Sequence, residues 1–131
     1  MQVIAPDAGH RKKQRHPLVS YHFPESLDAD ALEAVKAMTT AATPSNCGLM
    51  KCYQRGGRTG AQAACLIRDT MKVTGLSGQL APPVAALFYI DPEDPEAGGT
   101  GHTIRACRNA GVPVILQNHW VLWLDELEHP S

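Results

Sequence analysis

Short apolar blocks, separated by glycine, proline and charged residues, run along the chain and predict a mixture of helices and strands. The clearest element of the first half is a helix, for which Ser26 and Asp28 are candidate N-caps and which ends before Pro44. The surrounding pattern predicts four further elements: strands at residues 2–5, 18–23 and 48–53, and a helix at 61–73 opened by the glycine cluster at 56–60. The rest of residues 1–17 is expected to be a loop or an ordered arm.

The second half contains the strongest strand pattern, a run of seven apolar residues at 84–90 with prolines on one side and Asp91-Pro92 on the other. Such a run is typical of a strand buried on both faces. A polar loop and a glycine turn at 98–103 follow, then a helical pattern that ends at Gly111 and a second buried strand at 112–116. This order predicts a βαβ unit with parallel strands. Residues 120–127 form a last, amphipathic piece.

Length and charge limit the possible architectures and partners. A chain of 131 residues predicts a single domain over 1–131 with an ordinary core. Its 12 basic and 13 acidic residues leave a net charge of −1, so no overall field attracts a polyanion. The basic run at 11–15 is interpreted as a solvated arm, and a nucleic-acid partner is not expected. The chain has no apolar run of about 18 residues and no signal-peptide pattern, so we expect a cytoplasmic protein without membrane contact.

The cysteines and histidines predict neither a metal site nor a bound cofactor. The cysteines at 47, 52, 65 and 107 lack the Cys-x2-Cys spacing of zinc sites. We interpret them as reduced, with Cys65 and Cys107 as small buried residues. The histidines at 10, 16 and 22 recur every six residues, but no predicted helix or hairpin aligns them.

The glycine turn is the main candidate binding site. Glycines let backbone N–H groups approach an anion closely, and the N-terminus of the next helix adds about half a positive charge. We therefore expect a phosphate at the start of a helix near Gly101, with the N–H groups of 99–102 as main donors. Arg68 is a candidate either for a bidentate phosphate contact or for an ordinary salt bridge, whereas Arg105 and Arg108 are interpreted as surface charges. The candidate ligand-binding residues are Gly98, Gly99, Thr100, Gly101, His102, Thr103 and Arg68.

The same turn also has a purely structural interpretation, because glycines permit a tight connection between a strand and a helix. It matches neither the dinucleotide fingerprint G-x-G-x-x-G nor the Gly-Lys-Ser/Thr ending of the P-loop.

Residues 84–91 and 98–114 resemble the distal half of the SLOG superfamily, which comprises Rossmann-like nucleotide-binding domains related to the lonely-guy phosphoribohydrolases and DNA-processing protein A. In its phage and bacterial branch, a hydrophobic strand is followed by G-T-x-H-x-I/V-R-x-A-x-x-x-G-I/V-P-V. Residues 99–114 follow this line, with Cys107 in place of the usual Ala. Residues 64–71 are similar to the branch's A-G-P-I-R-N-x-x-M helix start, with Asp69 in place of the usual Asn.

This resemblance implies an α/β fold, namely a single Rossmann-like three-layer domain with a mostly parallel sheet of four or five strands, in which residues 64–116 hold the βαβ region. It implies a nucleotide, nucleoside phosphate or nucleotide-derived signal as ligand, in a phage-encoded binding or sponge protein. It also favours a homo-oligomer, since related domains complete their pockets across an interface. Trp120 and Trp123 are expected either to lie at such an interface or to cap the sheet, because tryptophans are costly to leave in water.

Two alternatives to a binding module remain. Nucleoside 2-deoxyribosyltransferases have a similar acidic loop and glycine turn, but their carboxylate nucleophile corresponds to Thr103 here. An N-glycosidic hydrolase or transferase would therefore need another carboxylate, for which Asp91 and Glu96 are the candidates, and we expect little or no catalysis. The second alternative is a catalytically inert interaction protein that uses Trp120 and Trp123 at an interface.

Overall fold

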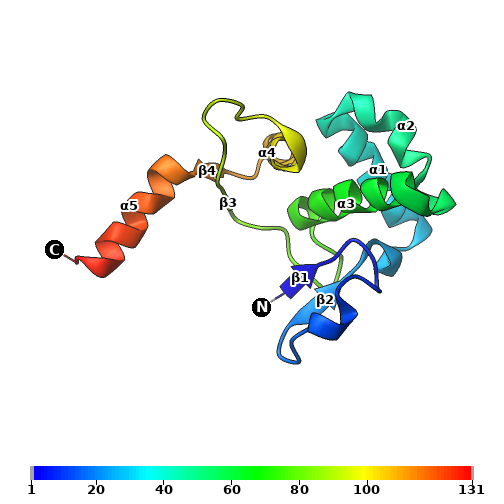
Figure 1. The fold of residues 1–131 in the computed structure, drawn as a ribbon, viewed down its shortest axis with the longest axis horizontal. Helices are drawn as coiled ribbons and strands as arrows, with labels where there is room; N and C mark the ends of the chain where they lie inside the picture. Colours follow the sequence, from blue (N-terminus) through cyan, green and yellow to red (C-terminus); the bar gives the residue numbers. More distant parts are fainter. Residues whose placement is uncertain (1, 131) are drawn as a thin grey trace.

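The computed structural model describes residues 2–130, and Figure 1 shows a helical body from which the C-terminal helix projects. The strands and helices are β1 (Gln2–Ile4), β2 (Ser20–His22), α1 (Ala29–Ala42), α2 (Cys47–Met50), α3 (Gly57–Thr74), β3 (Ala86–Phe88), α4 (Gly98–Ala110), β4 (Val114–Leu116) and α5 (Gln117–Glu128). Four short 3-10 turns join them: η1 (Lys12–Gln14), η2 (Pro24–Ser26), η3 (Pro44–Asn46) and η4 (Tyr53–Arg55). No helix in this part of the chain is long and apolar enough to cross a membrane.

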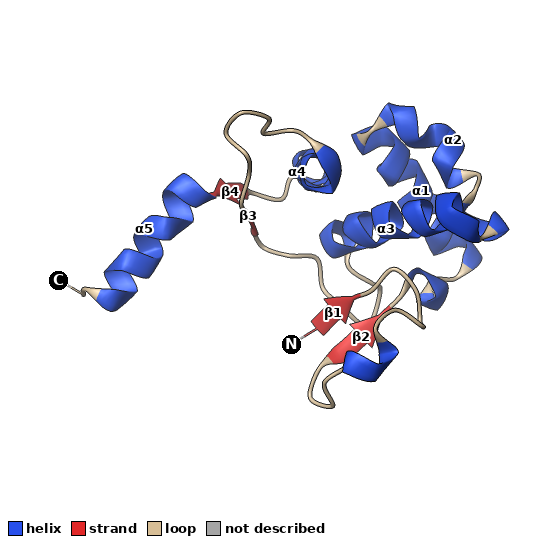
Figure 2. Cartoon of the chain, viewed as in Figure 1, coloured by secondary structure: helices blue, strands red, loops and turns tan. Residues whose placement is uncertain are grey.

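The strands form two separate parallel pairs, as Figure 2 shows. β1 pairs with β2, and β3 pairs with β4 in a register that sets Ala86 opposite Val114. The parallel β3–α4–β4 unit confirms the predicted βαβ unit, and the fold is α/β. Residues 2–130 do not contain the expected single sheet of four or five strands. Each strand has three residues, which leaves too little edge to recruit further strands.

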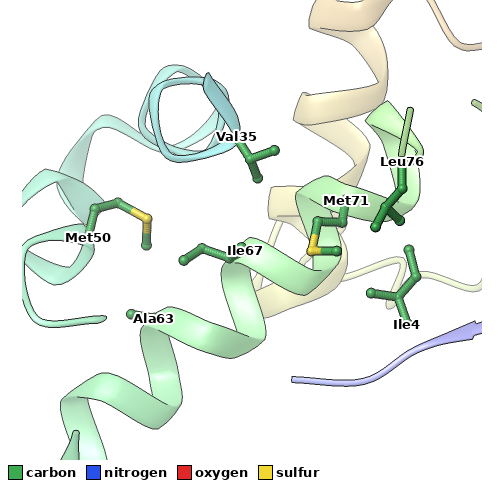
Figure 3. Close-up of a cluster of buried hydrophobic side chains, with 7 residues drawn as sticks. All are labelled: Ile4, Val35, Met50, Ala63, Ile67, Met71 and Leu76. Atoms are coloured by element: carbon green, nitrogen blue, oxygen red, sulfur yellow. The ribbon is translucent and has the colours of Figure 1, made fainter. Parts of the chain in front are cut away.

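Helix α3 lies at the centre of the main core (Figure 3). Its residues Ala63, Ile67 and Met71 recur at four-residue spacing, which places them on one face of the helix. The residues that pack with this face come from α1, α2, β1 and the loop after α3: Val35, Met50, Ile4 and Leu76.

A second, smaller core joins α4 to the strand pair β3–β4. Ala106 and Cys107 of α4 are buried against Ala42 of α1 and Val73 of α3. The strand-pair residues packed there are Ala86, Phe88, Val112 and Val114. Helix α4 therefore separates the helical body from the strand pair.

Local chemistry sets the helix ends as the sequence predicts. The Asp28 carboxylate accepts a hydrogen bond of 2.8 Å from the Ala31 N–H and so caps α1. Gly111 ends α4 with a φ of 74°, a left-handed conformation that favours glycine. The Val112 N–H then donates to the Cys107 carbonyl, at 2.9 Å.

One predicted strand is absent, and the burial predicted for another is wrong. Residues 48–53 form the end of α2, a turn and the start of η4, and Leu49, Met50 and Tyr53 reach the core around α3 at helical rather than alternating spacing. The run at 84–90 is not buried on both faces, since Leu87 is 57% and Tyr89 is 74% exposed. Only the alternate residues Ala86 and Phe88 face α4.

The central position of Ile67 gives a direct test of this core. Because its side chain is fully buried, Ile67→Ala should lower the free energy of unfolding by about 2–5 kcal/mol, measured by urea denaturation. Leu18→Ala is the matched control, because Leu18 is 84% exposed and should change stability by less than about 0.5 kcal/mol. Equal effects of the two substitutions would contradict this packing.

Candidate functional site

A pocket of about 720 Å³ lies between α3 and the N-terminal turn of α4. Its lining comes from these two helices and from the segment after α1: Thr43, Asn46, Leu49, Arg58, Ala61, Gln62, Cys65, Leu66, Arg68, Asp69, Gly98, Gly99, His102 and Arg105. The pocket thus brings together four of the seven expected ligand-binding residues. These are Gly98, Gly99, His102 and Arg68.

One face of α3 supplies the longest wall of the pocket. Arg58, Gln62, Cys65 and Asp69 follow three- and four-residue spacing and so project from the same side. Helix α3 begins at Gly57, four residues before the expected start, because the glycine cluster forms its first turn. Gly56 and Gly57 have φ values of 71° and 68°, which glycine adopts without strain. The early start is what places Arg58 at the pocket.

The pocket lining is positively charged although the chain is not. Three guanidinium groups, those of Arg58, Arg68 and Arg105, face one carboxylate, that of Asp69. Arg58 makes no hydrogen bond or salt bridge with any residue in the range 2–130 and is exposed. Its guanidinium is therefore unpaired within the described residues.

Arg105 is a structural residue rather than the surface charge that we expected. Its Nε donates to the Ala42 carbonyl and one Nη to the Thr43 hydroxyl, both at 2.8 Å. The other Nη donates to the backbone carbonyl of Glu96, at 3.2 Å. Arg105 therefore joins the end of α1 to the loop before α4. Arg108 matches expectation: its guanidinium is 59% exposed.

The glycine turn is itself the first turn of α4, which begins at Gly98 rather than near Gly101. The Gly101 N–H is already used, because it donates to the Ala97 carbonyl at 3.1 Å. The N–H groups without an intrahelical partner are therefore those of residues 98–100, not 99–102. Gly98 has a φ of 63°, and a Cβ on Gly101 would collide with the backbone of Glu96. These two glycines have the structural role that the sequence left open.

The Asp69 carboxylate lies beside this helix N-terminus. Its Oδ1 accepts from Arg68 Nε (3.2 Å) and Nη2 (3.0 Å) and lies 3.2 Å from the Lys72 ammonium. A Cβ added to Gly99 would lie 3.3 Å from Asp69 Oδ2, so this oxygen is next to the turn. The chain's own anion thus compensates part of the positive end of α4.

His102 is a buried structural residue and not an exposed phosphate donor. Its ring is 1% exposed, and both nitrogens are used: Nδ1 lies 2.9 Å from the Thr43 hydroxyl and Nε2 lies 3.2 Å from the Thr70 hydroxyl. The Thr70 hydroxyl lies 2.7 Å from that of Thr39, which donates to the Val35 carbonyl at 2.8 Å.

The Thr70 hydroxyl also donates to the Leu66 carbonyl, at 3.2 Å, so the hydroxyls around the ring are tied to the backbone of α1 and α3. Both imidazole nitrogens thus lie against hydroxyl groups, which can donate or accept, and within residues 2–130 no carboxylate is hydrogen-bonded to the ring. Burial lowers the pKa of His102 below its ordinary 6.5; Asp69 opposes this effect and Arg105 adds to it.

The two threonines of the turn face elsewhere. Thr100 and Thr103 line an adjacent pocket of about 590 Å³ on the other side of Asp69, together with Arg68, Lys72 and residues of β3. The Thr103 hydroxyl donates to the Gly99 carbonyl at 2.8 Å and so stabilises the first turn of α4.

Neither carboxylate proposed for catalysis lines either of these two pockets. Asp91 Oδ1 accepts from the Glu93 N–H at 2.9 Å in an exposed turn. The Glu96 carboxylate lies 3.3 Å from Arg108 at the surface. Within residues 2–130, no group of three or more His, Cys, Asp or Glu side chains is placed to hold a metal ion.

Sequence reasoning missed Arg58, Arg105 and Asp69 as residues of the site. Asp69 was visible as a departure from the SLOG pattern, and Arg58 could have been found by extending the helical spacing of α3 back into the glycine cluster. No local pattern marks Arg105, because its partners are more than 60 positions away for two of its three bonds.

Comparisons of the chain with protein-family models, curated proteins and solved structures found no match. The site's own geometry therefore carries the functional argument.

The buried imidazole predicts an acid-sensitive fold. Because the folded state lowers the pKa of His102 below 6.5, the unfolded chain binds the proton more readily, and stability should fall as pH decreases below about 6.5. The contribution of this one group is at most about 1.4 kcal/mol per pH unit. Urea denaturation between pH 7.5 and 5 measures it. His102→Gln should be less stable at pH 7.5 but should lose this part of the slope; an unchanged slope would show that His102 is not its source.

Proposed function

We propose that this chain binds a small organic anion with a flat apolar part, most simply a nucleotide or nucleoside phosphate, in the pocket between α3 and α4. The observation that carries the proposal is the imbalance of three guanidinium groups against one carboxylate in a single concave site. Phosphate oxygens are the natural partners of arginine, which offers several N–H donors in a planar fork.

The rest of the lining suits a nucleobase. Leu49, Ala61 and Leu66 offer an apolar wall for the flat ring, and the amides of Asn46 and Gln62 can hydrogen-bond its edge. Arg58, in the first turn of α3, is then the main phosphate contact. Arg105 contributes positive potential rather than new bonds, because its three guanidinium nitrogens already donate to Ala42, Thr43 and Glu96. Arg68 is held by Asp69 through Nε and Nη2, which leaves its Nη1 as a second possible donor.

We also propose that the domain is a reduced Rossmann-like domain of the SLOG kind. The support is the parallel pairing of both strand pairs and the β3–α4–β4 unit that carries the glycine turn at its N-terminal helix end. In such folds ligands sit beyond the carboxyl ends of parallel strands, where this turn follows β3.

The proposal predicts a specific dependence on Arg58. In calorimetric titrations with nucleoside monophosphates, Arg58→Gln should weaken binding about tenfold to a hundredfold, because a charge-assisted contact is worth about 1.5–3 kcal/mol. Arg55→Gln is the matched control, because this substitution removes the same charge from an exposed residue of η4 that does not line the pocket.

Two results would count against this function. Equal weakening by the two variants would indicate a general charge effect, and the absence of binding to every nucleotide and nucleoside phosphate in the panel would leave the inert interaction protein as the better interpretation. Unphosphorylated nucleosides should bind the natural chain more weakly than their monophosphates do. Arg58→Gln should bind nucleosides and monophosphates with equal, low affinity.

We expect binding without turnover. Within residues 2–130, Asp69 is the one carboxylate that lines the pocket; Arg68 and Lys72 hold its Oδ1, and its Oδ2 lies against Gly99. A nucleophile or general base needs free access within about 3–3.5 Å of the reacting atom. Incubation with nucleoside phosphates and deoxynucleosides should therefore release no free base, as measured by chromatography. Base release that disappears in Asp69→Asn, or in Asp91→Asn or Glu96→Gln, would instead establish the N-glycosidic hydrolase or transferase.

A further inference from the structure

Helix α5 is apolar but uncovered. Of its twelve residues six are large and apolar, yet none is buried, and every residue from Val121 to Pro130 is exposed. A helix that is apolar on most sides is normally buried, and one of twelve residues is marginal in water without packing. In Figure 1 it projects away from the helical body.

The helix is nevertheless fixed in direction. The Gln117 side-chain amide donates to the Ile90 carbonyl (2.8 Å) and accepts from the Ile90 N–H (3.1 Å). The Trp120 indole N–H donates to the Phe88 carbonyl at 2.9 Å. Trp120 therefore caps the strand pair, whereas Trp123, one turn further, is 46% exposed. Leu87 of β3 and Tyr89, just after its end, are also exposed.

The accessible surface area of the chain can be compared with that of a compact monomer of the same mass. The chain exposes 8531 Å². A compact monomer of 14.1 kDa exposes roughly 6,700 Å², so the excess is roughly 1,800 Å². A standard interface removes about 800 Å² from each partner, and obligate homodimers remove about 1,000–2,500 Å² from each. The excess belongs to the whole chain, and it is similar in size to the area that one dimer interface would remove.

The charges of α5 indicate how two copies would meet. Its last turns carry Asp125, Glu126 and Glu128 with no basic residue, and its first turn has no acidic residue. This is the reverse of what a solitary helix favours, because the negative end of its dipole lies at the C-terminus. Two copies packed antiparallel place each acidic end beside the positive N-terminal end of the other helix.

We propose that α5 and the outer face of β3 form a symmetric homodimer interface in which the two α5 helices pack antiparallel. A two-fold axis lets one surface serve both partners, so no other protein is needed to cover it. The pocket between α3 and α4 contains no residue of β3 or α5, so this interface is independent of ligand binding.

Light scattering after size exclusion tests the proposal on the full chain at about 10–100 µM. The expected mass is twice 14.1 kDa. Leu122→Glu should shift the mass to that of a monomer, and Leu18→Glu, which places the same charge on an exposed leucine far from α5 in sequence, should not. Circular dichroism confirms that both variants fold. A monomeric natural chain, or a Leu122→Glu variant that stays dimeric, would overturn the proposal.

Substitutions at Asn118 test the antiparallel arrangement. Asn118 lies in the exposed first turn of α5. In the antiparallel dimer Asn118→Glu should raise the dissociation constant about threefold or more at low salt, and Asn118→Lys should lower it, because the residue faces the partner's acidic end. A parallel pair places the two copies of residue 118 together, so both substitutions would weaken it. A higher dissociation constant for the Asn118→Lys dimer would therefore refute the antiparallel packing.

Discussion

The burial of His102 is the constraint on which the arrangement of helices depends. One imidazole connects three elements, because it is carried by α4 and contacts Thr43 after α1 and Thr70 of α3. A neutral ring satisfies both hydroxyl groups with one donor and one acceptor, whereas a charged ring would need acceptors on both sides in a dry environment. Arg105 strengthens the same joint from outside by donating to Ala42 and Thr43. The pocket exists because this joint holds the start of α4 beside α3.

Helix α3 has two functions that its sequence keeps on separate faces. Ala63, Ile67 and Met71 pack in the main core, while Arg58, Gln62 and Cys65 line the pocket. The helix is long enough to do both because it recruits the glycine cluster as its first turn. Asp69 then lies where α3 meets α4, and its carboxylate partly neutralises the end of α4 that would otherwise attract an external anion most strongly.

The sequence predicts those features of this molecule that depend on neighbouring residues. The Asp28 cap, the Gly111 stop and the β3–α4–β4 unit follow from local spacing and turn chemistry, and the structure confirms them. The predictions that fail concern features that depend on residues distant in the sequence. The run at 84–90 is apolar, but which of its faces is covered depends on α4, and Arg105 is structural only because the chain folds Ala42 against it. His102 seemed a ligand donor for the same reason, since its burial comes from Thr43 and Thr70 rather than from its glycine-rich neighbours.

The separation of faces on α3 has a consequence for how such a chain can change over generations. Residues 58, 62 and 65 line the pocket, and none of them belongs to the main core at 63, 67 and 71. Mutations can therefore alter the pocket lining with little loss of stability, because positions outside the core tolerate most side chains. The pocket-lining face of α3 can therefore change by mutation, while selection for a stable core acts on the other face of the same helix.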